Sequence, residues 1–428
     1  MGILFRNVRL VDPASGTDRI TDLSVREGLV DDIGTELAQE GFEVIDGTGK
    51  ILAPGLIDMH VHLREPGFEH KETILTGMRA AAAGGFTRIA AMPNTSPALD
   101  TPETLERVRD RASAGMVHVH PIGALSFGLE GREPTDLDAL KNAGACAFSD
   151  DGMPVPDSAM MYRAMEWAHR LDRIVVDHCE DHSLSRGGVM NRGANSEKLG
   201  LPGIPKAAED IMTARDILLA REYNLPVHIC HVSTRTSVEL IRQAKADGVR
   251  VTGEAAPHHF SLTDDALLNG NTNARVSPPL REEEDREAVL AGLADGTLDI
   301  IATDHAPHTA EEKNRPLDQA PNGMVGLETA VGLVFTRLIQ TGVMGLLEAI
   351  GAMTWKPAQI FGLPGGRIAK GESADLVLID PELIWKVDPT EFHSKGSNSP
   401  FIGMTLKGRP IMTVIGGRKA MENNNVFF

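Results

Sequence analysis

The central part of the chain alternates apolar runs with segments of helical periodicity, and this alternation constrains the fold more than any other feature. The runs are rich in β-branched and other apolar residues, which is typical of buried strands. There are eight of them, at residues 56–63, 86–93, 117–125, 145–149, 173–179, 226–232, 250–256 and 298–304. Between them lie stretches such as ETILTGMRAAAAGG and TSVELIRQAKADG, whose apolar residues recur at helical spacing before a terminal glycine. Eight successive βα units predict an α/β fold, namely a (β/α)₈ barrel of the TIM type.

The two ends of the chain differ from this middle part. Residues 1–53 alternate apolar and polar side chains and are punctuated by glycine and aspartate, which is typical of short antiparallel strands. Residues 364–428 show the same pattern, for example in ADLVLIDPEL and GRPIMTVIGG. We therefore predict two domains: a small β-sandwich formed by residues 1–53 and 364–428, and a barrel formed by residues 54–363.

Composition and charge exclude several classes of function. With 60 acidic against 42 basic residues, the formal net charge is −18, which disfavours binding to nucleic acid or to an anionic membrane surface. The first residues lack the pattern of a secretion signal, and no stretch approaches the roughly 18 apolar residues of a membrane span. Cys146, Cys179 and Cys230 lie scattered inside strand-like runs, where we expect small buried residues. A cytoplasmic protein is the expectation.

Polar side chains cluster where the predicted barrel strands end. His60 and His62 close the first strand, and both project the same way because residues i and i+2 share a strand face. Four more such residues end the fourth, fifth, sixth and eighth strands: Asp151, His178, His231 and Asp304. In a barrel these ends meet at one face, where active sites lie. Imidazole and carboxylate together suit zinc and similar divalent ions, and Asp151 is placed to bridge two of them.

Each of these residues also has a structural interpretation when taken alone. A single His-x-His pair is weak evidence for a metal, and a lone His178 or His231 would more often be a barrel histidine with satisfied hydrogen bonds. Asp304 alone would more often cap a helix. We favour the metal site because six candidates fall independently on one predicted face. Five other histidines lack this placement and are expected to be structural: His169, His182, His228, His258 and His259. His305 neighbours Asp304 but should point the other way.

One cation stands at the same rim of the predicted barrel. Arg64 follows the histidine pair in period-two phase, and Asn94 and His308 follow the ends of two other strands. A guanidinium matches a carboxylate in bidentate geometry, so these three residues predict a clamp for an anionic substrate. The alternative is that Arg64 only pairs with Glu65 or Asp58.

The segment after the eighth strand is expected to cover this face. Residues 308–323, HTAEEKNRPLDQAPNG, are polar and contain two prolines, which predicts a long loop over the strand ends. Long loops in this place often close over a substrate, so the segment predicts a lid.

The motifs resemble those of a known superfamily. Residues 54–62, PGLIDMHVH, are similar to the amidohydrolase signature, and the continuation LREPG at 63–67 is similar to that of dihydroorotases. Further matches follow in family order: MPNT at 92–95, FSDDG at 148–152, HVS at 231–233, PPLR at 278–281, ATDHAPH at 302–308, GLET at 326–329 and GESADL at 371–376. The resemblance spans essentially the whole chain. It is greatest to the longer bacterial form (class I), with Asp151 where hydantoinases carry a carbamylated lysine.

This resemblance implies a metal centre and a reaction. It implies two Zn²⁺ ions, the first held by His60, His62 and Asp304, the second held by His178 and His231, and both bridged by Asp151 and a hydroxide. Asp304 would be the catalytic residue that moves a proton between water and the ring nitrogen. The implied reaction is the reversible, zinc-dependent cyclisation of N-carbamoyl-L-aspartate to L-dihydroorotate plus water, a step of de novo pyrimidine (UMP) biosynthesis.

The resemblance also implies the substrate contacts. The carboxylate would be held by Arg64, Asn94 and His308, and the ring would lie against Ser277, Asn322 and Gly323. Two of these positions depart from the family pattern, because Ser277 replaces an asparagine and Asn322 replaces the phenylalanine of a Phe-Gly pair. Ring recognition is therefore less well specified by the sequence than metal binding, and a weaker affinity or a different cyclic substrate stays open.

Two other functions remain as alternatives. The first is another cyclic amidase, of the hydantoinase, dihydropyrimidinase or allantoinase type, against which Asp151 and the Arg64 clamp argue. The second is a non-catalytic partner of aspartate transcarbamoylase, although such relatives lose metal ligands that this chain retains. For partners, the resemblance implies a small anionic substrate and a homodimer, and it leaves open an association with aspartate transcarbamoylase.

Overall fold

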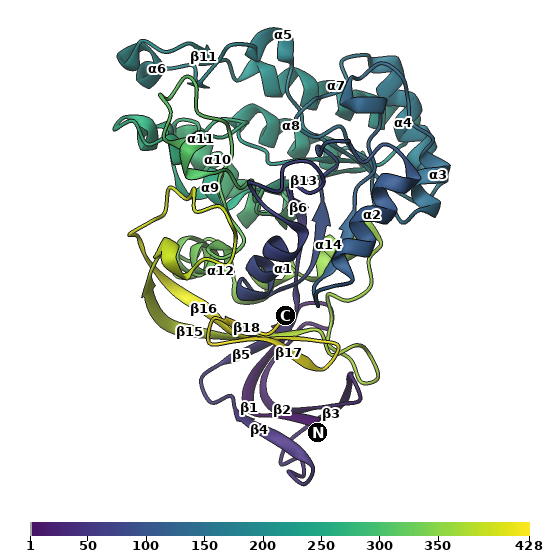
Figure 1. Cartoon of the computed structure of the whole chain (residues 1–428), viewed down its shortest axis with the longest axis vertical. Helices are drawn as coiled ribbons and strands as arrows, with labels where there is room; N and C mark the ends of the chain where they lie inside the picture. Colours follow the sequence, from purple (N-terminus) through teal and green to yellow (C-terminus); the bar gives the residue numbers. More distant parts are fainter. Residues whose placement is uncertain (1) are drawn as a thin grey trace.

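The computed structural model describes residues 2–428 and consists of an α/β barrel above a β-rich domain (Figure 1). The barrel strands are β6 (Leu56–Val61), β7 (Phe86–Ala91), β8 (His118–Pro121), β9 (Val175–Asp177), β12 (Val227–Ile229), β13 (Val251–Ala255) and β14 (Ile300–Ile301). They form two parallel sheets, β6-β7-β8 and β9-β12-β13-β14. Phe148 joins the sheets through bridges to Gly123 and Val175, and Val61 pairs with His305 to close the ring. The predicted barrel is confirmed.

Helices on the outside of the barrel follow its strands. They are α1 (Ile74–Ala83), α2 (Pro102–Ala112), α3 (Leu137–Asn142), α4 (Ser158–Arg170), α7 (Ala207–Tyr223), α8 (Arg235–Ala246), α10 (Glu283–Ala294) and α12 (Ala330–Val334). In α1, Ile74, Met78 and Ala81 are buried at helical spacing, so one stripe of the helix packs on the strands. Thr73 begins this helix, because its side chain accepts a hydrogen bond from the backbone N–H of Thr76. The sequence pattern and the capping residue together determine where the helix forms.

Shorter elements occupy the loops and the end of the barrel. They are η1 (Phe127–Leu129), α5 (His182–Ser185), β10 (Met190–Asn191), α6 (Ala194–Leu199), β11 (Gly203–Ile204), α9 (Pro257–Ser261), η2 (Asp264–Leu267), η3 (Thr272–Ala274), α11 (Ala310–Lys313), η4 (Phe335–Ile339), α13 (Leu346–Gly351) and α14 (Trp355–Phe361). Phe361 of α14 packs with Ile57, Cys146 and Cys230 in the barrel interior. The interior of the barrel is therefore a packed core and not a channel. The functional face must lie at the end of the barrel where the carboxyl ends of the strands meet. All three cysteines are buried, as predicted.

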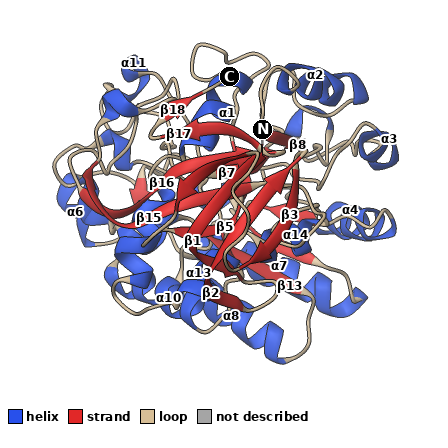
Figure 2. Cartoon of the chain, turned by 90° about the horizontal axis from the view of Figure 1, so that it is seen from below, coloured by secondary structure: helices blue, strands red, loops and turns tan. Residues whose placement is uncertain are grey.

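Both ends of the chain contribute strands to one sheet, seen from below in Figure 2. Its strands are β1 (Gly2–Asp12), β2 (Thr17–Arg26), β3 (Leu29–Gly34), β4 (Phe42–Asp46), β5 (Ile51–Pro54), β15 (Leu376–Lys386), β16 (Thr405–Ile415), β17 (Arg418–Glu422) and β18 (Asn425–Val426), with η5 (Pro389–Glu391) between β15 and β16. Their order is β18-β17-β16-β15-β5-β1-β2-β3, with β4 beside β1. Phe5, Leu23 and Leu376 belong to a hydrophobic core that is separate from the core of the barrel. The predicted joining of the two termini is confirmed, while the boundaries at residues 53 and 364 stay a prediction.

The expectation of antiparallel strands near the N-terminus is wrong for β4 and holds only on one side of β5, which pairs antiparallel with β15. β4 and β5 pair with β1 in parallel. Parallel neighbours need a crossover connection between them. The hairpin of β2 and β3 is part of that connection, and local alternation of apolar residues does not reveal it.

Several barrel strands are shorter than the apolar runs that predicted them. Residues 145–149 form bridges at Phe148 and a few further backbone hydrogen bonds, such as that of Cys146 N–H to the carbonyl oxygen of Pro121, and the last barrel strand has two residues. Side-chain carboxylates replace part of the missing ladder: Asp150 Oδ1 accepts hydrogen bonds from the backbone N–H of Leu125 at 2.8 Å and of Ser126 at 3.0 Å. No helix within residues 2–428 has the length and the apolar character that a membrane crossing requires.

Candidate active site

The six residues predicted to bind metal, called the metal-facing residues below, meet at the carboxyl ends of the barrel strands. They are His60, His62, Asp151, His178, His231 and Asp304, and all are buried. Two stand on β6 itself or directly after it, and the others lie in the turns that follow later strands. Buried charged and imidazole side chains are rare without a partner or a metal, so their convergence calls for a specific reason.

Asp151 lies at the centre of this group. Its Oδ1 is 3.4 Å from His60 Nε2 and 3.6 Å from His178 Nδ1, and its Oδ2 is 3.5 Å from His62 Nε2. His231 Nε2 is 3.8 Å from the same Oδ1. Two atoms that each bind zinc at about 2.1 Å in tetrahedral geometry lie roughly 3.4 Å apart. The spacing around Asp151 therefore fits a carboxylate shared by two ions.

Asp304 completes the group on the side of the first histidine pair. Its Oδ1 is 3.1 Å from His62 Nε2 and 3.6 Å from His60 Nε2. Its φ of 49° is in the left-handed region, which non-glycine residues rarely adopt and which often occurs at functional sites. His60 Nε2 and Asp151 Oδ1 are buried and have no hydrogen-bond partner among residues 2–428. A bound cation would satisfy both atoms, so the donor set fits a metal centre.

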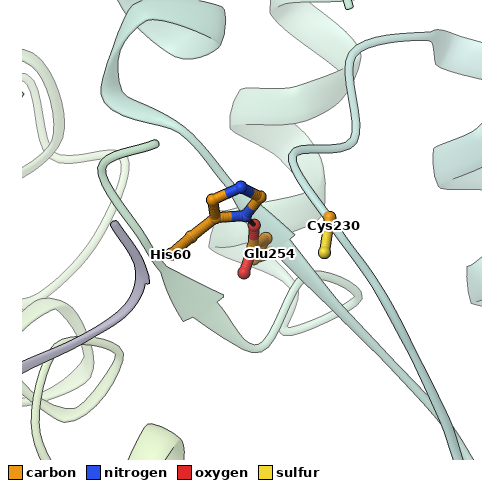
Figure 3. A group of neighbouring side chains, drawn as sticks. All are labelled: His60, Cys230 and Glu254. Atoms are coloured by element: carbon orange, nitrogen blue, oxygen red, sulfur yellow. Dashed lines mark hydrogen bonds and ion pairs between the residues drawn. The ribbon is translucent and has the colours of Figure 1, made fainter. Parts of the chain in front are cut away.

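Glu254 in β13 lies against the ring of His60 (Figure 3), at Nδ1 and not at the Nε2 that faces Asp151. Its Oε1 accepts from His60 Nδ1 at 2.7 Å and from the backbone N–H of His231 at 3.1 Å, and its Oε2 is 3.1 Å from His228 Nε2. Burial alone would raise the pKa of Glu254, but His60 and His228 outweigh it and hold this pKa below its usual range. Sequence analysis missed Glu254, whose only signal is a carboxylate inside an otherwise apolar barrel strand.

Two more residues fix the orientation of metal-facing histidines. Asn94 Oδ1 accepts from His62 Nδ1 at 2.8 Å, and Glu180 Oε2 lies 2.9 Å from His178 Nε2. In each ring the other nitrogen then keeps its lone pair for a metal. Ser277 Oγ donates to the same Glu180 oxygen at 2.8 Å. Ser277 therefore uses its hydroxyl proton on Glu180 in this structure, and its role as a ring contact stays a prediction.

A cavity of about 250 Å³ lies over the metal-facing side chains. Five of the six predicted substrate contacts line it: Arg64, Asn94, Ser277, Asn322 and Gly323. His182, which was expected to be structural, lines it as well. In this cavity the residues predicted to bind metal and Arg64 and Asn94 of the predicted clamp line the same space.

His308 does not line this cavity. Its Nε2 donates to the carbonyl oxygen of Asn322 at 2.8 Å, and its Nδ1 lies 3.4 Å from Lys71 Nζ. Burial and the nearby cations, Arg64 first among them, lower the pKa of His308 to about 3, so the ring is neutral and has one N–H. His308 thus supports the cavity wall from behind, and its direct contact with the substrate stays a prediction.

Arg64 directs its charge toward the cavity. Its Nε donates to the carbonyl oxygen of Pro307 at 3.2 Å, and within residues 2–428 no carboxylate forms an ion pair with it. The alternative pairings do not occur, because Glu65 pairs with Arg111 and Asp58 accepts backbone N–H groups. Burial lowers the pKa of Arg64 to about 10, so the guanidinium stays protonated at neutral pH. A half-buried cation that lines a cavity and has no carboxylate partner favours an anionic ligand.

His305 points away from the metal-facing group, as expected. Its Nε2 lies 3.3 Å from a carboxylate oxygen of Glu72, and its Nδ1 accepts from the backbone N–H of Gly326 at 3.2 Å. Both ring nitrogens are therefore engaged in the loops, and His305 has a structural role.

Comparison with known proteins identifies the family. A family model described as dihydro-orotase-like matches residues 49–237, and one described as an amidohydrolase family matches residues 318–420. The chain is 53% identical to a dihydroorotase from Pelotomaculum thermopropionicum, over 99% of both proteins. The chain belongs to the dihydroorotase family. Another member of this family, from Syntrophus aciditrophicus, is 49% identical over 98% of this chain and 99% of the relative.

Solved structures with the same architecture come from neighbouring cyclic amidases. An L-hydantoinase (dihydropyrimidinase) from Arthrobacter aurescens has a TM-score of 0.89 at 26% identity, covering 100% of this chain and 97% of that one. A dihydropyrimidinase from Brevibacillus agri has a TM-score of 0.85 at 25% identity, with 100% and 96% covered. The dihydroorotase-family relatives are about twice as similar in sequence, so the alternative of a hydantoinase-type enzyme is not favoured. The chain is an amidohydrolase with the fold of these enzymes.

Proposed function

We propose that this chain is a dihydroorotase, which interconverts N-carbamoyl-L-aspartate with L-dihydroorotate and water in pyrimidine biosynthesis. The observation that carries the proposal is the unpaired Arg64 guanidinium, which lines the same cavity as Asp151 and Asp304. A cyclic amide that also bears a carboxylate uses both parts of this cavity. Neutral rings such as hydantoin or dihydrouracil offer the guanidinium carbonyl oxygens but no carboxylate to balance its charge. The family relatives named above support the same reaction.

For the metal we propose two Zn²⁺ ions per chain. One would be held by His60, His62 and Asp304, the other by His178 and His231, with Asp151 shared between them. Imidazole nitrogen and carboxylate oxygen are ligands that zinc prefers. When bound, such a pair supplies polarisation of the amide carbonyl and a lower pKa for water at the site.

Asp304 is proposed to hold the proton during the reaction. In ring opening it accepts a proton from water as the water oxygen bonds to the ring carbonyl carbon. It then delivers the proton to the ring nitrogen as the carbon–nitrogen bond breaks. Burial alone would raise the pKa of Asp304, but the hydrogen bond with His62 and the charge of His60 lower it, so the carboxylate enters the reaction ionised. In ring closure the same carboxylate accepts the proton of the attacking carbamoyl nitrogen.

The substrate is oriented by the remaining cavity residues. Arg64 would bind the substrate carboxylate, and Asn94 would assist, because its amide nitrogen makes only a long contact of 3.5 Å with the carbonyl oxygen of Asp151. The ring would lie against Ser277, Asn322 and Gly323. A side chain at Gly323 would meet atoms of Ala306 at 2.8 and 2.9 Å, so this part of the wall needs glycine.

Conversion in both directions tests the proposed function. The zinc-loaded protein should bring pure L-dihydroorotate and pure N-carbamoyl-L-aspartate to the same final ratio. Removing the metal with a chelator should abolish both conversions, and metal analysis should show full recovery only near two zinc ions per chain. No conversion of either compound by protein that carries two zinc ions would contradict the reaction. Full recovery with one ion per chain would contradict the second metal site.

The assembly and location of the enzyme are further proposals. We expect a homodimer, and an association with aspartate transcarbamoylase stays a prediction, as does a cytoplasmic location. Light scattering on the chain alone, and on its mixture with aspartate transcarbamoylase, measures the first two directly.

A further inference from the structure

One wall of the cavity is held from behind by two buried side chains that have no part in the proposed chemistry. We call Asn322 and Gly323 the substrate wall, since both line the cavity. Lys313 and Asn398 lie behind it, and their exposed fractions are 2% and 4%. Lys313 belongs to the segment that was expected to form a lid, whereas Asn398 comes from the long connection between β15 and β16.

Lys313 directs its ammonium group at backbone carbonyl groups. Its Nζ donates to the carbonyl oxygens of Pro321 at 2.9 Å and Gly323 at 3.0 Å, and that of Arg275 lies at 3.4 Å. A buried ammonium without a carboxylate partner is costly. Burial accordingly lowers the pKa of Lys313 to about 7. Such a costly arrangement needs an explanation, and the carbonyl groups that it engages belong to the substrate wall or adjoin it.

Asn398 uses both ends of its amide on the same part of the molecule. Its Nδ2 donates to the carbonyl oxygens of Gly323 at 3.1 Å and Ala306 at 3.2 Å. Its Oδ1 accepts from the backbone N–H of His308 at 3.0 Å, and its carbonyl oxygen accepts from Val325 at 3.1 Å. The side chain therefore ties the turn after the last barrel strand to the substrate wall.

The two side chains converge on a single carbonyl group, that of Gly323. The φ of Gly323 is 126°, a backbone conformation that residues with a side chain rarely adopt and that glycine adopts readily. Its N–H donates to the carbonyl oxygen of Arg275 at 2.9 Å, so the peptide units on both sides of Gly323 are held. Swinging residues 308–323 away as a lid would break the hydrogen bonds that join this segment to Asn398 and to the carbonyl oxygen of Arg275.

We propose that Lys313 and Asn398 are positioning residues, which fix the Gly323 carbonyl and so set the wall against which the substrate ring binds. The inference depends on the proposed function in naming the ring as the ligand. It assigns to residues outside the cavity a role in substrate binding and none in metal binding or proton transfer. Residues 308–323 then form a fixed wall instead of a mobile lid.

Two variants separate this role from a general contribution to stability. Lys313→Met removes the donor but keeps an apolar stem, and Asn398→Asp places an acceptor against the carbonyl oxygens of Gly323 and Ala306. The control is Lys245→Met, because Lys245 also donates to a backbone carbonyl oxygen, that of Gly296 at 3.2 Å, in addition to pairing with Asp299 at 2.7 Å, and Asp299 lies where β14 begins, away from the cavity. We expect about a tenfold higher KM for L-dihydroorotate in both test variants, with kcat within about twofold and zinc content unchanged. In the control, KM should stay as in the unaltered enzyme.

Amide hydrogen exchange over residues 306–326 provides a readout that does not depend on activity. Exchange in this segment should become faster in Lys313→Met and Asn398→Asp and stay unchanged in Lys245→Met. Unchanged KM and unchanged exchange in both test variants would overturn the proposal, and so would a loss of zinc that accounts for the lost activity. If the unaltered enzyme does not convert dihydroorotate, the proposed function fails, and the exchange result alone then decides whether the two residues hold the wall.

Discussion

Replacing Asp304 by alanine is expected to lower kcat for L-dihydroorotate at least about 1,000-fold and to leave the barrel folded. The variant loses a carboxylate that faces His60 and His62 and also the group that we propose accepts the proton. Nearby Asp151 does not replace it, because Asp151 is surrounded by histidine nitrogens on both sides. The measurement is the turnover rate of zinc-loaded protein, with circular dichroism as the check on folding.

A second substitution separates the two roles of Asp304. Asp304→Asn keeps an oxygen that can face the metal but removes the basic carboxylate. We expect nearly normal zinc content with turnover still strongly reduced. Normal activity in either variant would show that Asp304 is not the proton acceptor.

Replacing Arg64 by methionine is expected to raise KM for L-dihydroorotate roughly 100-fold, with a much smaller change in kcat. The half-buried guanidinium lines the cavity and has no carboxylate partner among residues 2–428, so we expect the substrate carboxylate to be its counter-ion and to complete its burial. Losing one partner of a buried charge pair costs about 2–5 kcal/mol, which corresponds to roughly 30- to 3,000-fold in affinity. Methionine keeps much of the apolar stem, so the wall around it should persist.

Arg111→Met is the matched control for this substitution. Arg111 pairs with Glu65, the neighbour of Arg64, at 3.2 Å, but 65% of its side chain is exposed and it does not line the cavity. Its replacement should leave KM unchanged. A change in kcat alone for Arg64→Met would mean that Arg64 does not bind the substrate carboxylate.

The metal-facing residues could be predicted from the sequence because their placement depends on local periodicity. His60 and His62 share a face because alternate residues of a strand point the same way. The carboxyl ends of all the strands of a barrel lie at one face, so residues that follow different strands meet there. Their supporting residues could not be found in this way. Glu254 is 194 positions away from His60, and its contact with the ring depends on how two strands face each other across the barrel interior.

The substrate contacts were harder to predict because their side chains have competing partners. His308 stands at the expected rim, yet the carbonyl oxygen of Asn322 takes its N–H. Lys313 lies in a polar segment that was predicted to be a long loop and a lid, but backbone carbonyl groups allow its side chain to be buried. Such outcomes depend on the path of a loop backbone, and composition does not determine that path.

The central claim is that the cavity recognises a cyclic amide by its carboxylate, and relative kcat/KM for L-dihydroorotate and dihydrouracil tests it most directly. Dihydrouracil has the same ring without the carboxylate, so the comparison isolates the contribution of that group. We predict that the zinc-loaded enzyme prefers L-dihydroorotate by at least about 100-fold. Equal or faster hydrolysis of dihydrouracil would contradict the claim and would assign the enzyme to the cyclic amidases that act on neutral rings.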